Sequence, residues 1–335
     1  MEAGKKKMLA TLVGCNYAGT ENELQGCIND VHATRTVLLD RFGFAPGDVT
    51  VLTDDPGAGA VLPTGAGVRQ ALADMVARAA PGDMLFFHFS GHGTLVPPVS
   101  RHGGRDDEAI VPCDFNLITD VDFRELVDRV PRGATFTMVS DSCHSGGLID
   151  QEKEQIGPDA AAADPDLHAH AVRFLPYARV LGHLSGASGL STSHHVADHL
   201  VALFGADASA KFHFHRHGNS SGGARTDDAD AGILLSGCQK DELSADVEAD
   251  GSKAACGAFT AALQAVLAAH PAPMSNREVV RRAREVLGEQ GFGFQQHPCL
   301  YCSDANADAP FLGQRAGDQG QEQLSKEAAA MPTLS

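Results

Sequence analysis

A cysteine and a histidine stand just after two apolar runs of the chain, each among glycines and small polar residues. His92 lies in the stretch 90–93, which reads Ser-Gly-His-Gly, and Cys143 lies in 141–147, which reads Asp-Ser-Cys-His-Ser-Gly-Gly. A cysteine is a strong nucleophile once a neighbouring base takes its proton, and a histidine can act as that base. Either residue alone is more often a structural residue of a core than a catalytic one. The pair, with glycines that let a substrate backbone come close, favours catalysis.

The elements that must position this pair are short apolar runs that alternate with helix-like stretches. We predict strands at residues 8–13, 49–52, 84–89 and 134–140, with helices between them. This alternation predicts an α/β fold, a mostly parallel sheet with helices on both faces. His92 and Cys143 then follow two strands of one sheet, and the carboxyl ends of such strands face the same crevice.

The remainder of the chain has two different parts. Residues 151–230 lack a sustained strand pattern and are rich in Ala, Asp, His, Gly and Ser, which is typical of a partly disordered linker. Apolar runs return at 232–237 and 296–302, with two helical patterns between them. We expect them to complete a six-stranded sheet. The predicted organisation is a large segment, a linker, a small segment of the same sheet and a flexible tail: 1–150, 151–230, 231–313 and 314–335.

Composition limits the classes of partner. The chain has 335 residues, 43% of them hydrophobic, and 26 Lys and Arg against 43 Asp and Glu, a formal net charge of -17. Such a charge argues against nucleic acid and anionic membrane surfaces; it favours cations or basic substrates, or only aids solubility. The 8 cysteines show no disulfide spacing, and the apolar run 8–13 is too short for a signal peptide or a membrane span. We therefore predict a cytoplasmic protein.

The motifs around His92 and Cys143, together with 26–31 (Gly-Cys-Ile-Asn-Asp-Val), resemble those of metacaspases, which are caspase-like cysteine peptidases. Stretches 111–120 and 232–239 are similar to the plant and algal type II subgroup, and so is the order of large segment, linker and small segment. Caspases place their histidine about 50 residues before the cysteine, as this chain does. The resemblance covers 5–152 and 231–313 and implies a caspase-hemoglobinase-like fold and a monomer.

The resemblance assigns the catalytic roles. Cys143 is implied as the nucleophile and His92 as its general base, so that an acyl-enzyme forms on the thiol and water then hydrolyses it. The backbone N–H groups of Gly93 and Cys143 are the implied oxyanion donors.

The resemblance also implies cleavage of protein and peptide substrates after Arg or Lys. The residues that match the specificity (S1) pocket of the family are Asp30 and Asp141, with Cys27 and Ser90 on its wall. Two carboxylates in a partly dry pocket favour a guanidinium or an ammonium group. A caspase-like peptidase that prefers Asp or Asn is an alternative, which these carboxylates disfavour. A non-catalytic scaffold that binds basic proteins is another, and the intact Cys143 and His92 argue against it.

Some members of the family depend on calcium, so the resemblance implies Ca²⁺ as a cofactor. Ca²⁺ needs several oxygen ligands, mostly carboxylates. The matching positions are Asp107, Asp120 and Asp150, and Asp122 is a further candidate. Val121 stands where relatives have an unbroken acidic run, which predicts weaker binding.

Relatives mature by cutting their own linker after a basic residue, and we expect the cut here at Arg173 or Arg179. A basic linker residue in the pocket would block it beforehand. The sequence thus predicts a calcium-dependent cysteine endopeptidase, made as a zymogen, with its own linker among its substrates.

Overall fold

A seven-stranded sheet forms the centre of the chain in the computed structural model, which describes residues 6–55, 57, 61–97, 106–149, 152–157, 171–190, 192–217, 232–239, 242–249, 254–292 and 296–313. The strand order is β2-β1-β3-β7-β10-β13-β8. The first five strands are parallel, and the last two pair antiparallel. In chain order the strands are β1 (Met8–Gly14), β2 (Val49–Thr53), β3 (Met84–Ser90), β7 (Thr135–Asp141), β8 (Glu154–Ile156), β10 (Gly232–Ser236) and β13 (Cys299–Tyr301).

The predicted mostly parallel α/β sheet is confirmed, but the described sheet has seven strands where we expected six. The additional strand, β8, lies inside the predicted linker. It has only three residues, Glu-Gln-Ile, of which none is fully buried, so it has no apolar run. Its place depends on pairing with β13, a contact that local sequence does not reveal.

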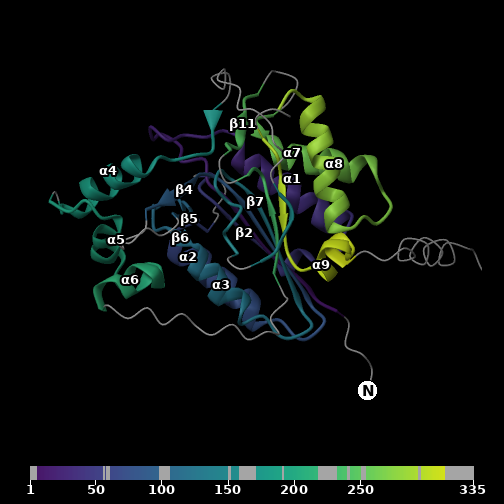
Figure 1. Cartoon of the computed structure of the whole chain (residues 1–335), viewed down its shortest axis with the longest axis horizontal. Coiled ribbons are helices and arrows are strands. Elements are labelled where there is room, and N and C mark those ends of the chain that lie inside the picture. The colour runs from purple at the N-terminus through teal and green to yellow at the C-terminus, as the bar shows by residue number, and fades with distance from the viewer. Residues whose placement is uncertain are drawn as a thin grey trace, which may run out of the picture.

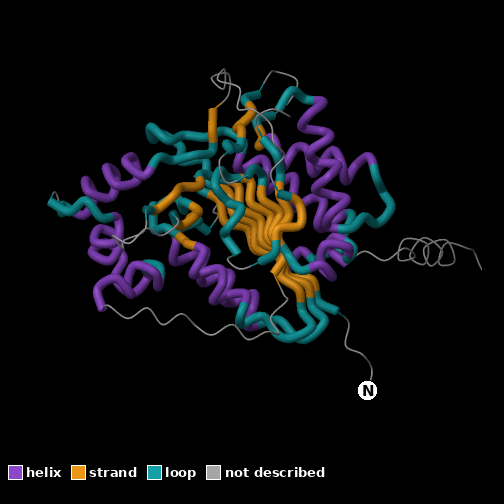
Figure 2. Tube along the Cα trace, in the orientation of Figure 1, coloured by secondary structure: helices purple, strands orange, loops and turns teal. Residues whose placement is uncertain are grey.

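Helices cover both faces of the sheet (Figures 1 and 2). On one face, α1 (Cys27–Asp40), α7 (Ala258–Ala269) and α8 (Asn276–Glu289) share a hydrophobic core, with α9 (Asp304–Asp308) at its edge. On the other face lie α2 (Gly65–Ala77) and α3 (Asp120–Val127). Thr64 caps α2 and accepts a hydrogen bond from the Gly67 N–H. None of the helices in the described parts of the chain is long and apolar enough to cross a membrane.

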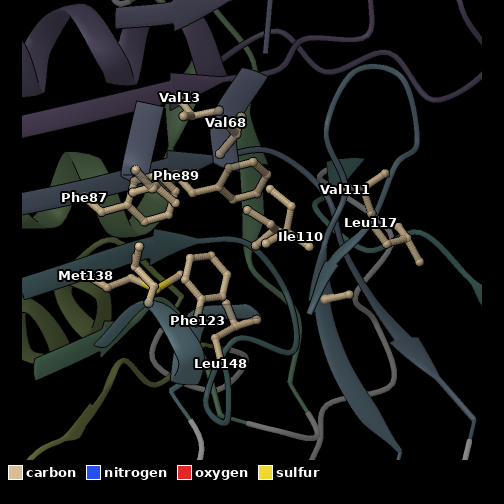
Figure 3. Packing of buried hydrophobic residues seen from close by; sticks show 14 of the residues in the cluster. Val13, Val68, Phe87, Phe89, Ile110, Val111, Leu117, Phe123, Met138 and Leu148 are labelled. Carbon is tan, nitrogen blue, oxygen red and sulfur yellow. The ribbon is translucent and has the colours of Figure 1, made fainter. Parts of the chain in front are cut away.

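The core explains why the strands before His92 and Cys143 carry large hydrophobic residues on both faces. Phe87 and Phe89 of β3 and Met138 of β7 pack towards Phe123 of α3 (Figure 3). Phe86, between the two phenylalanines, faces the opposite helix layer. Both faces of β3 are therefore buried, and most residues of either parity are hydrophobic, with His88 and Ser90 as buried polar exceptions.

Residues 171–190 and 192–217 of the linker are folded against the large segment. They contain β9 (Ala171–Val172), α4 (Tyr177–Ser188), α5 (Val196–Phe204) and α6 (Ala210–His217). The helices lie beside a small sheet of β4 (Gly93–Val96), β5 (Asp107–Ile110) and β6 (Ile118–Thr119), as Figure 1 shows. β9 joins a second small sheet with β11 (Ala245–Val247) and β12 (Cys256–Gly257).

Candidate active site

The two predicted catalytic residues follow neighbouring strands. β3 and β7 pair in parallel with Ser90 opposite Asp141, so the loops that carry His92 and Cys143 leave the sheet at the same edge. Cys143 is fully buried, and the Ser244 N–H donates to its Sγ over 2.9 Å. The next residue, His144, has a φ of 51°, a left-handed value uncommon outside glycine. A sharp turn therefore follows the nucleophile directly.

The hydrogen bonds of His92 define its protonation state. Its Nε2 lies 2.8 Å from the Asn22 carbonyl oxygen. Because a carbonyl only accepts, Nε2 carries the proton and Nδ1 carries the lone pair. Nδ1 is buried and has no hydrogen-bond partner among the described residues. Burial lowers the pKa of His92 to about 4, so the ring is neutral near pH 7. A neutral ring with a free lone pair is what a general base requires.

Two backbone N–H groups converge on one carbonyl oxygen. Gly93 N and Cys143 N lie 2.9 and 3.2 Å from the carbonyl oxygen of Arg173, a residue of the linker. Paired donors of this kind form an oxyanion hole, which stabilises the charge that develops when a thiol attacks a carbonyl. A Cβ at Gly93 would lie 1.9 Å from the Cys143 carbonyl oxygen, so only glycine permits this approach.

The side chain of Arg173 fills a pocket of carboxylates. Its Nη2 lies 2.8 Å from Asp30 and 2.9 Å from Asp246, and its Nη1 lies 3.3 Å from Asp141 and 2.8 Å from the Ser90 hydroxyl. All of these side chains are buried. Burial lowers the pKa of Arg173, but the surrounding acidic groups outweigh it and raise the pKa well above its ordinary value. Burial raises the pKa of Asp30 to about 6, although Arg173 opposes the shift.

Neighbouring groups fix the carboxylates of the pocket. Asp141 accepts hydrogen bonds from Thr260, at the start of α7, and from the Ser244 hydroxyl. Asp30 accepts from the Gly257 N–H at 2.9 Å. A Cβ at Gly257 would lie 2.2 Å from Asp141 Oδ2 and 2.3 Å from Arg173 Nη1. The guanidinium thus occupies space that only glycine leaves open.

Of the predicted wall residues, Ser90 contacts the arginine, and Cys27 lies close enough to act on its charge. Burial raises the pKa of the Cys27 thiol well above its usual range, while Arg173 opposes this. Cys27 is therefore a neutral, apolar part of the wall.

Asp246 is a pocket residue that the sequence did not single out. Besides Arg173, its carboxylate accepts the N–H groups of Gln25 and Gly26 before α1. It stands in β11 beside other acidic residues, and nothing in this short polar stretch distinguishes it from surface acids. Its antiparallel pairing with β9, which brings it to the arginine, is a contact between distant parts of the chain.

The linker runs through the site as an extended strand. The Arg173 N–H donates to the Ser244 carbonyl at 2.9 Å, and Phe174 bridges to Gly93. The bond between Arg173 and Phe174 is thus held on both sides beside Cys143. Arg179, the other predicted cleavage site, is more than half exposed on α4 and lies 3.5 Å from Glu21. The structure brings Arg173 to the nucleophile and leaves Arg179 outside the cleft.

The residues predicted to bind calcium have other partners. Lys211 of α6 places its ammonium against Asp107 and 3.5 Å from Asp120. Asp122 accepts from the Thr119 N–H at 2.8 Å and so caps α3. Asp150 lies outside the described residues. Among the described side chains no group of three or more His, Cys, Asp or Glu is placed to hold a metal ion. In this arrangement Asp107 and Asp120 are already paired with a lysine ammonium, which does not fit a Ca²⁺ ion at these two described residues.

Comparison with known proteins agrees with this geometry. The family model described as a caspase domain matches residues 7–310. Metacaspase-9 of Arabidopsis thaliana is 54% identical over 322 residues, which cover 92% of this chain and 98% of the relative. Metacaspase-7 of the same plant is 37% identical and covers 90% and 99%. The solved structure of protein GSU0716 from Geobacter sulfurreducens shares the fold, with a TM-score of 0.60 and 21% identity over 90% of this chain and 97% of that one. With a caspase domain along most of its length and close metacaspase relatives, the chain belongs to the metacaspase family of cysteine endopeptidases.

Proposed function

We propose that this enzyme cleaves proteins after arginine, and after lysine less efficiently, and that its own linker blocks it until the bond between Arg173 and Phe174 is cut. One observation carries the proposal. The guanidinium of Arg173 lies among three carboxylates, while its carbonyl oxygen accepts from the Gly93 and Cys143 N–H groups. This is the position that a substrate residue before the cleaved bond must occupy.

The reaction follows from the groups around that carbonyl. Nδ1 of His92 takes the proton of Cys143, and the thiolate attacks the carbonyl carbon. The two N–H groups hold the oxyanion, and the protonated histidine then gives its proton to the leaving amine. An acyl-enzyme on Cys143 remains, which water hydrolyses in a second round of the same steps.

Asp246 supplies the preference for arginine over lysine. Its Oδ1 lies 2.9 Å from Nη2 and 3.3 Å from Nε of Arg173. Lysine has no counterpart of Nε and presents one compact ammonium in place of a planar fork. An acidic side chain in this pocket would face three carboxylates, which argues against the Asp or Asn preference.

Blockage and self-cleavage have a common cause in this arrangement. β9 pairs with β11 as a substrate strand would, so the linker occupies the cleft in the register of a substrate. Other substrates are excluded until the linker is cut. We assign calcium no role in this reaction, because the Lys211 ammonium lies between two of its predicted ligands, Asp107 and Asp120.

The test uses the purified full chain, N-terminal sequencing of its fragments, and a peptide assay. We expect a fragment that begins at Phe174, no self-cleavage in Cys143→Ala, and faster turnover of Arg peptides than of Lys peptides. Arg173→Gln should prevent this cut, whereas Arg179→Gln, the matched control, should not. Cleavage that persists in Cys143→Ala would overturn the mechanism, and normal cutting of Arg173→Gln at the same bond would overturn the assigned pocket.

A further inference from the structure

The chain is also held after the bond between Arg173 and Phe174. The Leu175 N–H donates to the Gly93 carbonyl at 2.9 Å, and the Thr94 hydroxyl donates to the Leu175 carbonyl at 2.7 Å. The Phe174 ring packs edge-on against His144, with 4.7 Å between ring centroids. Leu175 is only 2% exposed. The first two residues beyond the bond therefore have their own binding sites.

The helices that follow anchor this segment further. Val180 and Leu184 of α4, Leu200 of α5 and Phe212 of α6 belong to the hydrophobic core of the large segment. The His183 ring stacks on Phe115 at 3.8 Å, and Asn116 donates to the Asp207 carbonyl at 2.8 Å. All of these contacts lie beyond the bond, and none requires it to be intact. These contacts would hold the new N-terminus at Phe174 near Cys143 after the cut.

We propose that this enzyme also forms peptide bonds: the docked amine of Phe174 attacks the acyl-enzyme, so that the cut after Arg173 is reversible and a fraction of chains is rejoined. The proposal rests on self-cleavage at Arg173. It adds an aminolysis activity to the hydrolysis proposed above, with an N-terminal Phe-Leu segment as the nucleophile.

The chemistry needs no reagent that the site lacks. In the acyl-enzyme, the Arg173 carbonyl carbon is bonded to Cys143 Sγ. The amine lone pair of Phe174 forms a C–N bond, and the C–S bond breaks with its electron pair on sulfur. The proton lost by the amine passes through His92 to the thiolate. Thioester and amine become amide and thiol, with no change in oxidation state, and the oxyanion donors serve as in the forward direction.

Proximity is what allows the amine to compete with water. A reacting group held in the right geometry acts with an effective concentration on the order of 10⁵ M or more. Fragments that remain docked do not separate. Cleavage therefore releases little of the translational and rotational entropy that favours hydrolysis of an ordinary peptide. Both effects favour a mixture of cut and intact chains over complete cleavage.

The experiment starts from the full chain and, separately, from fully cut two-chain enzyme. Each is placed at pH 8 in water labelled with the heavy oxygen isotope, where about half or more of an N-terminal amine is unprotonated. Intact mass is followed over time. We expect both samples to reach the same ratio of cut to intact chain. Chains rejoined from the cut enzyme should carry the heavy isotope in a fraction of their Arg173 carbonyls. Hydrolysis places one heavy oxygen in the carboxylate, and re-formation of the thioester then expels either carboxylate oxygen as water.

Two variants test whether docking of the N-terminus at Phe174 determines the fraction of intact chains. Leu175→Asp and the milder Thr94→Val should loosen the docked N-terminus and lower the intact fraction at the end point, by about tenfold for Leu175→Asp. Leu190→Asp, at an exposed leucine of the same linker, is the control and should behave as wild type. A Phe174 N-terminus with complete cutting and no heavy isotope in any intact chain would overturn this inference alone. The absence of any cut at Arg173 would instead overturn the proposed self-cleavage.

Discussion

Two places on the enzyme hold a positive charge of the linker between carboxylates, and they differ in depth. In the pocket, the guanidinium of Arg173 is fully buried and faces three carboxylates. Near the start of α3, the ammonium of Lys211 is 14% exposed, and its partners Asp107 and Asp120 are 20% and 19% exposed. One site lies beside the nucleophile, whereas the other fastens a linker helix to the large segment.

The difference shows what each contact can select. A buried charge without its partner costs about 3–5 kcal/mol, whereas a partly exposed pair contributes about 1 kcal/mol or less. A planar guanidinium needs oxygens at fixed positions, but an ammonium accepts many arrangements. Under the proposed function the pocket should therefore select one side chain, whereas the Lys211 contact requires only a compact cation.

The largest effect on activity is expected when one carboxylate of the pocket is removed. Asp30→Asn leaves the substrate guanidinium with less compensation in a buried site, so kcat/KM for Arg peptides should fall roughly 10²–10³-fold. Asp40→Asn, an exposed position of the same helix, is the control. Steady-state assays of both pre-cut variants check this. Equal activity of the two would show that Asp30 does not hold the substrate.

The next effect concerns pH. Burial lowers the pKa of His92 to about 4, below its ordinary value, so the base should remain neutral in the blocked chain down to that pH. Self-cleavage should therefore continue at pH 5–6 and decline about tenfold per pH unit below pH 4. In the unfolded chain this histidine is protonated at a higher pH. The free energy of unfolding should therefore decrease as the pH is lowered from about 6.5 to about 4. Single-turnover gel assays and thermal unfolding across pH measure both. A rate that already halves near pH 6.5 would contradict a buried, neutral His92.

Asp246 should alter selectivity more than total activity. Asp246→Asn weakens the contact with Nε and Nη2, so the ratio of Arg to Lys turnover should fall by about tenfold. Glu248→Gln, at the exposed end of the same strand region, should leave the ratio unchanged. Paired Arg and Lys peptides measure it. A proportional loss on both peptides would mean that Asp246 contributes charge but no discrimination.

The smallest effect is expected at the exposed contact. Lys211→Met should loosen α6 and raise its hydrogen exchange several-fold, in line with about 1 kcal/mol. Lys153→Met, which removes the exposed pair with Asp304, is the control. In a Cys143→Ala background, calcium titration by calorimetry should show tighter binding once Lys211 is absent. Unchanged exchange and unchanged calcium binding would show that Lys211 neither fastens α6 nor competes with a metal ion.

How much the sequence predicts depends on whether a residue belongs to a local pattern. His92, Cys143 and Asp141 lie at the ends of apolar strands, so their convergence follows from the parallel sheet. Asp246 and β8 lie in short polar stretches whose positions depend on pairing with distant strands. Arg173 and Arg179 are both arginines of the linker, and no local sequence pattern shows which one is cleaved. Only the pairing of β9 with β11 distinguishes Arg173. Lys211 likewise gives no local sign that it faces Asp107.

Gly257 has a consequence for engineering. Its φ of -76° suits any residue, so alanine there strains no backbone, yet one methyl group would stand where the guanidinium must lie. Gly257→Ala should keep the thiol, the base and the oxyanion donors while closing the pocket. Such a chain should keep the fold of the protease but neither bind nor cleave a substrate with arginine before the cleaved bond. Selectivity for a large cation here depends on a missing side chain.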